Sequence, residues 1–564
     1  PGTRVLYLSR FASIGAMEES IRKATEKALL ALGGSDIRFA VEWPADLSHG
    51  DFAVNAAMAG AKALGKNPKA LAEELAPLIQ KELGADVESV TVAGPGFINI
   101  KLSAEAIRAQ VARAVDEGEK WGRGTEQDGR RIIVEYSCPN PFKEMHIGHL
   151  MSTVIGEAVS RVIENSGATI ARDSYGGDVG PHVAKALWAL RRDGVTDVAD
   201  ASEVDKAYAH GSKAYEASEE AKAEIDALNV EVYKGEDPEL MNLWRKSREV
   251  CLEAFRELYA VLGTKFDYFF FESDTAAIGT EKVKEALSRG VFAESDGAVI
   301  YEGEKKGLHT LVFLTGRGTP TYEAKEIGLA FYKEERWPSD VSYILTAAEQ
   351  IGHFMVVKAA LEDIAPALGR KTHHIPHGFM RLTTGKMSSR EGNTVTARGL
   401  LAEVIEKARE KNEDPIVAEQ VAVAAIKYMI LRQAAGGDII FDPEQSLSLE
   451  GESGPYLQYA LVRARKILSY GESTGGEEVP AEPYAIEHLI IRFPEVAARA
   501  AREHAPHYVA QYLTTLAAAW NSFYASEQVL GSPEEAYKQR MAKAFATTME
   551  NGLRILGIPT PKKM

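Results

Sequence analysis

Residues 131–150 have the sequence RIIVEYSCPNPFKEMHIGHL. The apolar, β-branched start of this stretch predicts a short buried strand. Pro139 and Pro141 keep the next segment extended and prevent a helix from beginning early. A helix is predicted over His146–Asn165, because apolar residues recur there at helical spacing: Leu150, Val154, Ala158 and Val162. Strand, proline-containing loop and helix in this order indicate the first half of a βαβ unit.

The second half of the unit follows directly. ATIARDSY, at residues 168–175, is another short strand pattern. A βαβ unit favours a Rossmann-type parallel sheet, which we expect within a domain covering residues 126–400. Residues from about 180 to 290 are rich in Ala, Glu and Lys and predict a helical insertion in that domain.

Two flanking domains are expected. WGRGTEQDGR, at residues 121–130, is polar and Gly-rich like a linker. Before it, a helical pattern at 70–83 and the strand–turn–strand pattern SVTVAGPGFINIKLS at 89–103 predict a small α+β domain over 1–125. From residue 401 to 564 long apolar-periodic helices dominate. The predicted fold class is therefore α/β, with a Rossmann-type catalytic domain between an N-terminal α+β domain and a C-terminal all-α domain.

Composition restricts the functional class. With 564 residues, 45% hydrophobic and 26% charged, the chain should be an ordinary multidomain soluble protein. It has no run of the ~20 apolar residues that span a bilayer and no secretory pattern, so a cytoplasmic location without membrane contact is expected. Two cysteines cannot form a four-thiolate zinc site, and no resident metal is expected. A net charge of −16 disfavours non-specific nucleic-acid binding but not specific RNA recognition.

Two motifs carry chemistry. His146-Ile-Gly148-His149 begins the predicted helix, whose positive end favours anions, and Gly148 allows a nucleotide to approach the backbone. Lys386-Met387-Ser388-Ser389-Arg390 lies in a Gly- and Ser-rich segment that suits a transient clamp on polyphosphate. Alone, the first is consistent with a polar helix cap and the second with a solvated loop. In this order within one domain, they resemble the HIGH-type sequence and KMSxx loop of class I aminoacyl-tRNA synthetases.

Further stretches resemble the arginyl-tRNA synthetase family. Residues 137–150 are similar to its SxPNPxK segment followed by HxGHL, and YEAKEIGLA at 322–330 is similar to its YxxxDxxxA helix. The resemblance continues in AEQIGHF at 348–354, in FDPEQSLSLEGESGPYLQYALVRARKIL at 441–468 and in HGDFAVNAAMAGAKALGKNP at 49–68. It therefore covers nearly the whole chain. It implies ATP-dependent ligation of arginine to tRNA-Arg through an arginyl-adenylate, by a monomer.

The resemblance implies a role for each motif residue. His146 and His149 would stabilise the α-phosphate, and Lys386 would hold the departing pyrophosphate. Gly148, Met387 and Ser388 would complete the ATP site, with Mg2+ bound to the nucleotide phosphates. KMSSR lacks the second lysine of other class I enzymes, and the resemblance implies that Lys143 compensates. A solvated loop lysine is the alternative for Lys143.

The same resemblance implies an arginine site. Ser137, Asn140 and Gln350 would bind the α-amino and carboxylate ends, and His149 and Asp178 would also face the amino acid. Glu135, Tyr322 and Glu326 would surround the guanidinium, whose donors pair well with carboxylates. Alternatives remain open: Glu135 as an ordinary strand-end acid, or Glu326 directed to solvent. Four positions depart from the family pattern: Cys138 in place of Ser, Met151 in place of Arg, Val179 in place of Trp and Glu326 in place of Asp.

Three other functions compete. A class I synthetase for another amino acid is one, although several of these need thiolate-bound zinc that two distant cysteines do not supply. A catalytically silent paralogue that binds tRNA or a partner would predict a broken motif, whereas His146, Gly148, His149 and Lys386 are all present. A small HIGH-containing nucleotidyltransferase does not fit the length or the two flanking domains.

Overall fold

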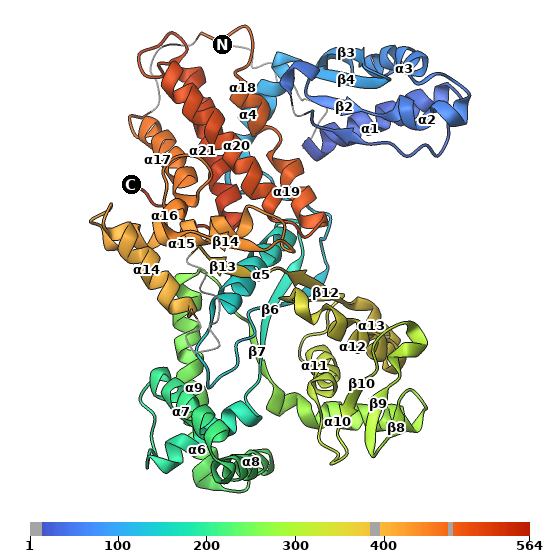
Figure 1. The fold of residues 1–564 in the computed structure, drawn as a ribbon. Coiled ribbons are helices and arrows are strands. Elements are labelled where there is room, and N and C mark those ends of the chain that lie inside the picture. Colours follow the sequence, from blue (N-terminus) through green and yellow to red (C-terminus); the bar gives the residue numbers. More distant parts are fainter. Residues whose placement is uncertain (1–13, 45, 384–394, 472–475, 477) are drawn as a thin grey trace.

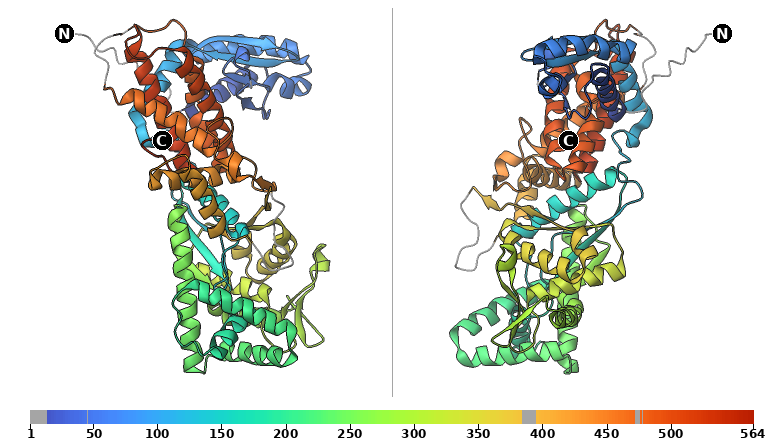
Figure 2. Two further views of the ribbon diagram at one scale, coloured as in Figure 1. Left: turned by 60° about the vertical axis from the view of Figure 1, so that its left-hand side comes forward. Right: turned by 90° about the vertical axis from the view of Figure 1, so that its right-hand side faces the viewer.

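The computed structural model describes residues 14–564 except 45, 384–394, 472–475 and 477. The molecule is elongated (Figures 1 and 2). The N-terminal domain and the C-terminal helices lie side by side at one end, and the central sheet follows them. Two lobes that emerge from the catalytic domain form the other end.

The N-terminal domain is built on an antiparallel sheet in the order β1-β2-β4-β3. Its strands are β1 (Val41–Glu42), β2 (Phe52–Val54), β3 (Val87–Ala93) and β4 (Phe97–Leu102). Alternate residues of β4 are buried, as expected of a sheet with one covered face. Its helices are α1 (Ile14–Ala31), α2 (Ala56–Leu64) and α3 (Pro68–Leu83), after which α4 (Ala104–Glu117) leads toward the C-terminal helices.

The segment after α4 is tied to the C-terminal domain, although its composition suggests a linker. Trp121 is buried, and its indole Nε1 donates a hydrogen bond to Thr548 Oγ1 at 3.1 Å. Asn551 Nδ2 donates to the Trp121 carbonyl at 2.9 Å. Both partners lie on α21 (Glu535–Ile555). The buried Trp121 side chain thus connects two segments that are more than 400 residues apart in sequence.

We therefore expect Trp121→Ala to lower the thermal stability of the chain. Removing a fully buried aromatic side chain costs about 3–5 kcal/mol, because the surrounding structure does not close the cavity. Trp121→Phe keeps most of the apolar contact and should have a smaller effect. Thermal unfolding followed by circular dichroism measures both variants. An alanine variant that melts at the wild-type temperature would show that this contact does not hold the domains together.

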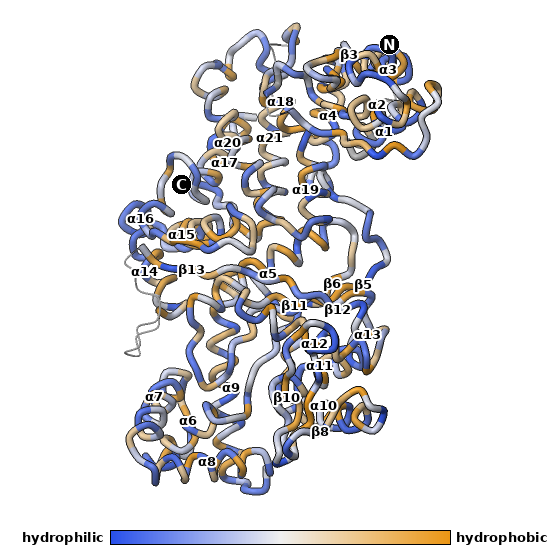
Figure 3. The backbone as a smooth tube through the Cα atoms, turned by 45° about the vertical axis from the view of Figure 1, so that its right-hand side comes forward, coloured by the Kyte–Doolittle hydropathy of each residue, from blue (hydrophilic) through white to orange (hydrophobic). Residues whose placement is uncertain are grey.

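The catalytic domain contains a five-stranded parallel sheet in the order β12-β11-β5-β6-β7. Its strands are β5 (Arg131–Glu135), β6 (Thr169–Gly176), β7 (Tyr268–Phe271), β11 (Val341–Ala347) and β12 (Thr372–His377). The helix α5 (Ile147–Asn165) connects β5 to β6. Figure 3 shows apolar stretches in α5 and the central strands, where the core lies. The predicted fold class is confirmed.

The helical insertion is shorter than the expected 180–290. It comprises α6 (Pro181–Arg192), α7 (Ala201–Ala217), α8 (Glu219–Lys234) and α9 (Pro238–Val261). The chain then returns to the sheet, where Tyr268–Phe271 pairs in parallel with Asp173–Gly176. This four-residue aromatic strand could not be recognised from the sequence, because a short apolar run has little periodicity of its own and the segments on both sides have a helix-forming composition.

The second lobe begins with α10 (Glu272–Ser288), which crosses α11 (Tyr322–Arg336) at very short range. A Cβ atom on Gly279 would lie 1.9 Å from the Ala324 carbonyl oxygen, and one on Gly328 would lie 2.2 Å from the Thr275 carbonyl oxygen. These glycines therefore set the position of α11, which carries Tyr322 and Glu326. Between the two helices is a small antiparallel sheet that the sequence patterns did not indicate: β8 (Ala293–Ser295), β9 (Ala298–Tyr301) and β10 (Leu311–Leu314).

The chain leaves β11 through the 3-10 turn η5 (Ala348–Gln350), α12 (Ile351–Ile364) and α13 (Pro366–Lys371). After β12, the strand β13 (Met380–Leu382) pairs in parallel with β14 (Ile439–Phe441), so hydrogen bonds cross the expected boundary at residue 400. The remaining chain is helical where it is described, with bounds α14 (Ala397–Arg409), α15 (Pro415–Leu431), α16 (Pro443–Ser446), α17 (Gly454–Leu468), α18 (Ala485–Ile490), α19 (Phe493–Arg502) and α20 (His507–Ser526), followed by α21. None of the helices in the described ranges is long and apolar enough to cross a membrane.

Candidate active site

The loop between β5 and α5 is strained. Ser137, Cys138 and Phe142 have φ values of 72°, 50° and 71°, a backbone region that non-glycine residues rarely adopt. The Ser137 N–H donates to Ser152 Oγ at 3.1 Å, and the Phe142 N–H donates to Cys251 Sγ at 3.4 Å. Contacts to α5 and α9 thus hold a conformation that costs free energy. Such strain concentrates at functional sites.

The two histidines of the first motif form a stacked pair at the start of α5. Their ring centroids are 3.8 Å apart, with 20° between the ring planes. His146 caps the helix, and its Nδ1 accepts a hydrogen bond from the Gly148 N–H at 3.1 Å. His149 Nδ1 accepts from the His146 N–H at 3.3 Å. Because both Nδ1 atoms are acceptors, both rings carry their proton on Nε2.

The surroundings keep both imidazoles neutral. Loss of hydration lowers the pKa of each ring from 6.5, that of His149 well below this value, and the charge of Lys143 lowers both further. The pair therefore presents two neutral Nε2–H donors at a positive helix end. This arrangement suits the binding of phosphate oxygens.

We expect 15N NMR of the histidine side chains to show both rings as Nε2–H tautomers at pH 7. The pKa of each ring should lie below the usual 6.5, and His149 should remain neutral to a lower pH than His146, because burial opposes its protonation. An Nδ1–H tautomer for either motif histidine would contradict the hydrogen bonds described above.

The residues that follow the second motif are paired with the first. The Ile147 N–H donates to the Val395 carbonyl at 3.2 Å, and the Ala397 N–H donates to the Met145 carbonyl at 2.8 Å. His146 and Thr396 form an antiparallel bridge between these two bonds. Lys386, Met387 and Ser388 lie outside the described residues. The chain on their C-terminal side is thus joined directly to the histidine pair, and β13 on their N-terminal side packs against α5.

A carboxylate cluster lies near the carboxyl end of β5, the strand end from which the chain leads to the histidine pair. It consists of Glu135 at the end of β5, Asp173 opposite it on β6, and Glu326 and Lys333 on α11. The Lys333 ammonium pairs with Glu135 and, at 2.7 Å, with Asp173 Oδ2. The side chains of Lys333, Glu135 and Asp173 are only 6%, 3% and 0% exposed. Since Glu326 is 4% exposed, it does not point into solvent, and its Oε1 atom has no hydrogen-bond partner among the residues that the structure describes.

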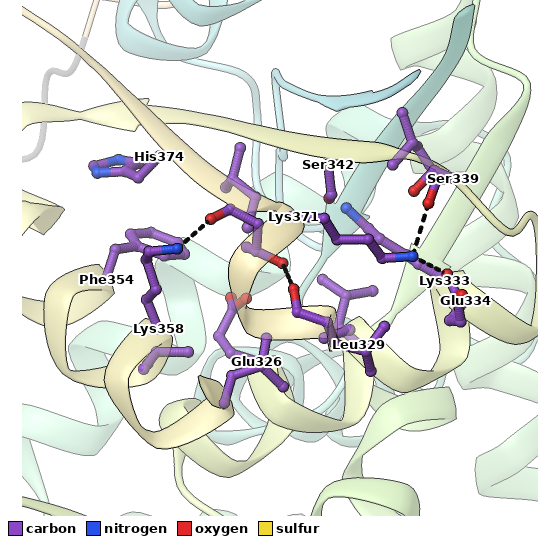
Figure 4. Close-up of a pocket in the computed structure, with 17 residues that line it drawn as sticks. Glu326, Leu329, Lys333, Glu334, Ser339, Ser342, Phe354, Lys358, Lys371 and His374 are labelled. Atoms are coloured by element: carbon purple, nitrogen blue, oxygen red, sulfur yellow. Dashed lines mark hydrogen bonds and ion pairs between the residues drawn. The ribbon is translucent and has the colours of Figure 1, made fainter. Parts of the chain in front are cut away.

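A cavity of about 40 Å3 lies behind Glu326 (Figure 4). At one end of it Lys371 bonds to Glu334 and to the Ser339 carbonyl, and Phe354 and His374 line the other end. The cavity is far smaller than the several hundred Å3 of a ligand pocket. A ligand would therefore reach Glu326 from the side of Tyr322, which begins α11 and is 42% exposed.

The electrostatics of the cluster are those of a cation site. Burial, with repulsion from Glu135, raises the pKa of Glu326 well above its usual value. Burial also raises the pKa of Asp173 to about 7, although the Lys333 ammonium opposes the shift. In the described structure, a single ammonium group, that of Lys333, thus lies among three carboxylates. The sequence patterns did not single out Lys333, although it lies two helical turns after Glu326 on the same face, a spacing that could have indicated it.

Three family models match successive regions of the chain. Residues 110–443 match the family model described as tRNA synthetases class I (R), catalytic domain, residues 457–564 match the DALR anticodon binding domain, and residues 15–102 match the arginyl tRNA synthetase N terminal domain. The chain is 30% identical to an arginine–tRNA ligase of Treponema pallidum, over 89% of this chain and 91% of the relative. The chain belongs to the arginyl-tRNA synthetase family. The resemblance drawn from the motifs and the predicted ligase function are confirmed.

Other relatives cover the chain almost completely. An arginine–tRNA ligase of Limosilactobacillus reuteri is 30% identical over 97% of this chain and 100% of the relative. The solved arginyl-tRNA synthetase of Thermus thermophilus superposes with a TM-score of 0.82 at 26% identity, over 97% of this chain and 100% of that chain. Both relatives therefore align with nearly the whole of this chain.

The remaining predicted arginine ligands differ in how many of their hydrogen-bonding atoms are already bonded within the chain. Ser137 Oγ is buried and shares hydrogen bonds with Tyr259 OH at 2.9 Å and Thr153 Oγ1 at 2.8 Å. Asn140 Oδ1 accepts from the Gly177 N–H at 2.8 Å, which leaves its amide N–H groups available. Gln350 ends the turn after β11 and is half-buried. All three lie in segments that follow strand ends of the central sheet.

Asp178 has an intramolecular role. Its side chain is fully buried and forms an ion pair with Arg248 of the insertion at 2.8 Å. It also accepts hydrogen bonds from the Ser273 N–H at 3.0 Å and hydroxyl at 2.7 Å. Both carboxylate oxygens are thus engaged in joining the insertion to the sheet. Its use as an arginine ligand in this member of the arginyl-tRNA synthetase family stays a prediction.

Lys143 and the residues that depart from the family pattern also have defined positions. The Lys143 ammonium lies 4.8 Å from the centroid of the Tyr208 ring, at the wall of a cavity of about 670 Å3 between the motif loop and the insertion. Cys138 Sγ donates to Glu135 Oε1 at 3.6 Å. Met151 and Val179 are buried, so both act in packing.

Within the described ranges, no group of three or more His, Cys, Asp and Glu residues is arranged to hold a metal ion.

Proposed function

We propose that this synthetase activates arginine at the stacked histidine pair and binds its guanidinium at the carboxylate cluster. A carboxylate oxygen of arginine attacks the α-phosphorus of ATP, and pyrophosphate leaves as the arginyl-adenylate forms. A hydroxyl of the terminal ribose of tRNA-Arg then attacks the carbonyl carbon, and AMP leaves. The observation that carries this proposal is a buried site with three carboxylates and one ammonium, at the same sheet edge as two neutral N–H donors.

The histidine pair would act on the phosphate. His146 and His149 present Nε2–H groups, which donate to the α-phosphate oxygens as negative charge builds up on them. Gly148 would help to form the nucleotide site by leaving room for the His146 imidazole, because a Cβ atom there would lie 2.9 Å from that ring. Lys386, with Met387 and Ser388, would hold the β- and γ-phosphates. Because both histidines are donors, they fit phosphate oxygens, and Mg2+ would be held by the phosphates and water. Lys143 would add positive charge beside the pair.

The arginine would lie between the histidine pair and α11. Glu326 and Glu135 would accept the guanidinium N–H groups, with Tyr322 covering them, and Ser137, Asn140 and Gln350 would bind the other end of the amino acid. We further propose that the chain acts as a monomer in the cytoplasm. The DALR anticodon binding domain at residues 457–564 and the N-terminal domain would hold tRNA-Arg.

The test is exchange of pyrophosphate into ATP with each of the twenty amino acids. We expect exchange with arginine only, and almost none without tRNA-Arg, since the family resemblance implies that tRNA is needed for activation. Lysine is the matched control, because it carries the same charge without the planar fork of donors. Exchange with another amino acid would overturn the arginine site. Tight tRNA binding without any exchange would support the silent paralogue instead.

A further inference from the structure

The carboxylate cluster has an excess of buried negative charge. Glu135, Asp173 and Glu326 come from three different elements, and the one ammonium that the described residues place among them is that of Lys333, which pairs with Glu135 and Asp173. Transfer of a carboxylate without its own cation into the interior is so unfavourable that the group binds a proton instead. The cluster therefore needs either a proton or a second cation.

No other group that faces the cluster in the described structure supplies that cation. On α11, Lys325 is already paired with Glu272 of α10 at 2.6 Å. Beyond the small cavity, Lys371 of α13 is paired with Glu334, and Lys358 of α12 donates to the carbonyl groups of Gly369 and Thr372. The remaining titratable side chains around the cluster are uncharged near neutral pH: Cys138, Tyr175, Tyr322 and His374.

We propose that the cluster holds a proton when no ligand is bound, and that the guanidinium of arginine replaces this proton. The proposal rests on the proposed function, which directs the guanidinium to Glu326. When the ligand enters, the O–H bond of a cluster carboxyl group breaks and the proton passes to solvent. The resulting carboxylate accepts guanidinium N–H bonds; among the described residues, Glu326 Oε1 and Asp173 Oδ1 are cluster oxygens without a hydrogen-bond partner, and Glu326 is the one to which the proposed function directs the guanidinium. Arginine uptake is thus an exchange of one cation for another.

The raised pKa values of Asp173 and Glu326 agree with this exchange. These groups titrate as a unit, so the proton belongs to the cluster. A guanidinium beside them favours the ionised form and lowers their pKa values. Protons are therefore released on binding wherever the free cluster is protonated. It follows that arginine affinity rises with pH through the neutral range, by up to about tenfold per pH unit for one proton, and levels off once the free cluster is ionised.

The experiment is calorimetric titration of the full chain with arginine at pH 7, in phosphate and in Tris. These buffers differ in ionisation enthalpy, so the difference in heat gives the number of protons released. We expect about 0.5–1 proton per arginine at pH 7 and a smaller number at pH 8.5. Citrulline, which has the same α-amino and carboxyl groups but an uncharged ureido end, should bind much more weakly and release none. Glu335→Gln, an exposed position on the same helix, should match the wild type.

The outcomes separate the inference from the function on which it rests. Arginine binding without proton release between pH 6 and 8 overturns the exchange. If Glu326→Gln nevertheless loses arginine binding, the assignment of the arginine site is still supported. Unchanged arginine binding in Glu326→Gln would instead overturn the site itself. Asp173→Asn is the second variant: it keeps the Glu326 carboxylate, and we expect it to bind arginine with fewer protons released and a flatter pH dependence.

Discussion

Glu326→Gln is expected to raise the KM for arginine by about two to four orders of magnitude. The substitution keeps the shape of a side chain that is 4% exposed but removes its charge. A buried guanidinium that loses a carboxylate partner costs about 3–5 kcal/mol. Because Glu326 Oε1 has no partner within the described chain, the loss should appear in arginine use more than in stability.

Glu326→Asp should give an intermediate KM. Aspartate keeps the charge but is one methylene shorter, by roughly 1.5 Å. The position of α11 is set by its close crossing with α10, so the helix is not free to move toward the ligand. Glu335→Gln on the exposed face is the matched control. Steady-state aminoacylation at varied arginine concentration decides the matter. A near-wild-type KM in Glu326→Gln would mean that Glu135 alone binds the guanidinium.

Lys386→Ala is expected to slow adenylate formation by about 30- to 1,000-fold, or about 2–4 kcal/mol, with little change in arginine affinity. The reason is that its ammonium would act on charge that develops as pyrophosphate leaves. Although Lys386 lies outside the described residues, the chain that follows its motif is hydrogen-bonded to the histidine motif through Val395 and Ala397.

Rapid-quench measurement of adenylate formation, with tRNA present, tests this variant. Arg381→Ala is the matched control, since it removes a positive charge from an exposed position on β13, five residues earlier. We expect the control to keep the wild-type rate. If Lys386→Ala also does so, the KMSSR segment has no part in the activation step.

Local patterns determined the order of elements and the position of the motifs. Prolines and apolar spacing place the start of α5 at the histidine motif, because a helix start depends on residues a few positions apart. The same reasoning gave the βαβ unit and the flanking domains. It could not distinguish β7 within helix-forming surroundings, and it could not anticipate that Asp178 pairs with Arg248, 70 residues later.

The sequence by itself therefore determined the class of enzyme and the motif residues that would contact ATP, since these depend on short ordered patterns and their resemblance to a family. Only the tertiary structure decided which charges the buried carboxylate cluster brings together. Glu135 and Lys333 are 198 residues apart in the chain. This pairing exists because β5, β6 and α11 come together in a space that excludes water, and there Glu326 Oε1 has no hydrogen-bond partner within the described part of the chain. Burial and the number of opposing charges set a carboxyl group's protonation, and neither can be obtained from local sequence.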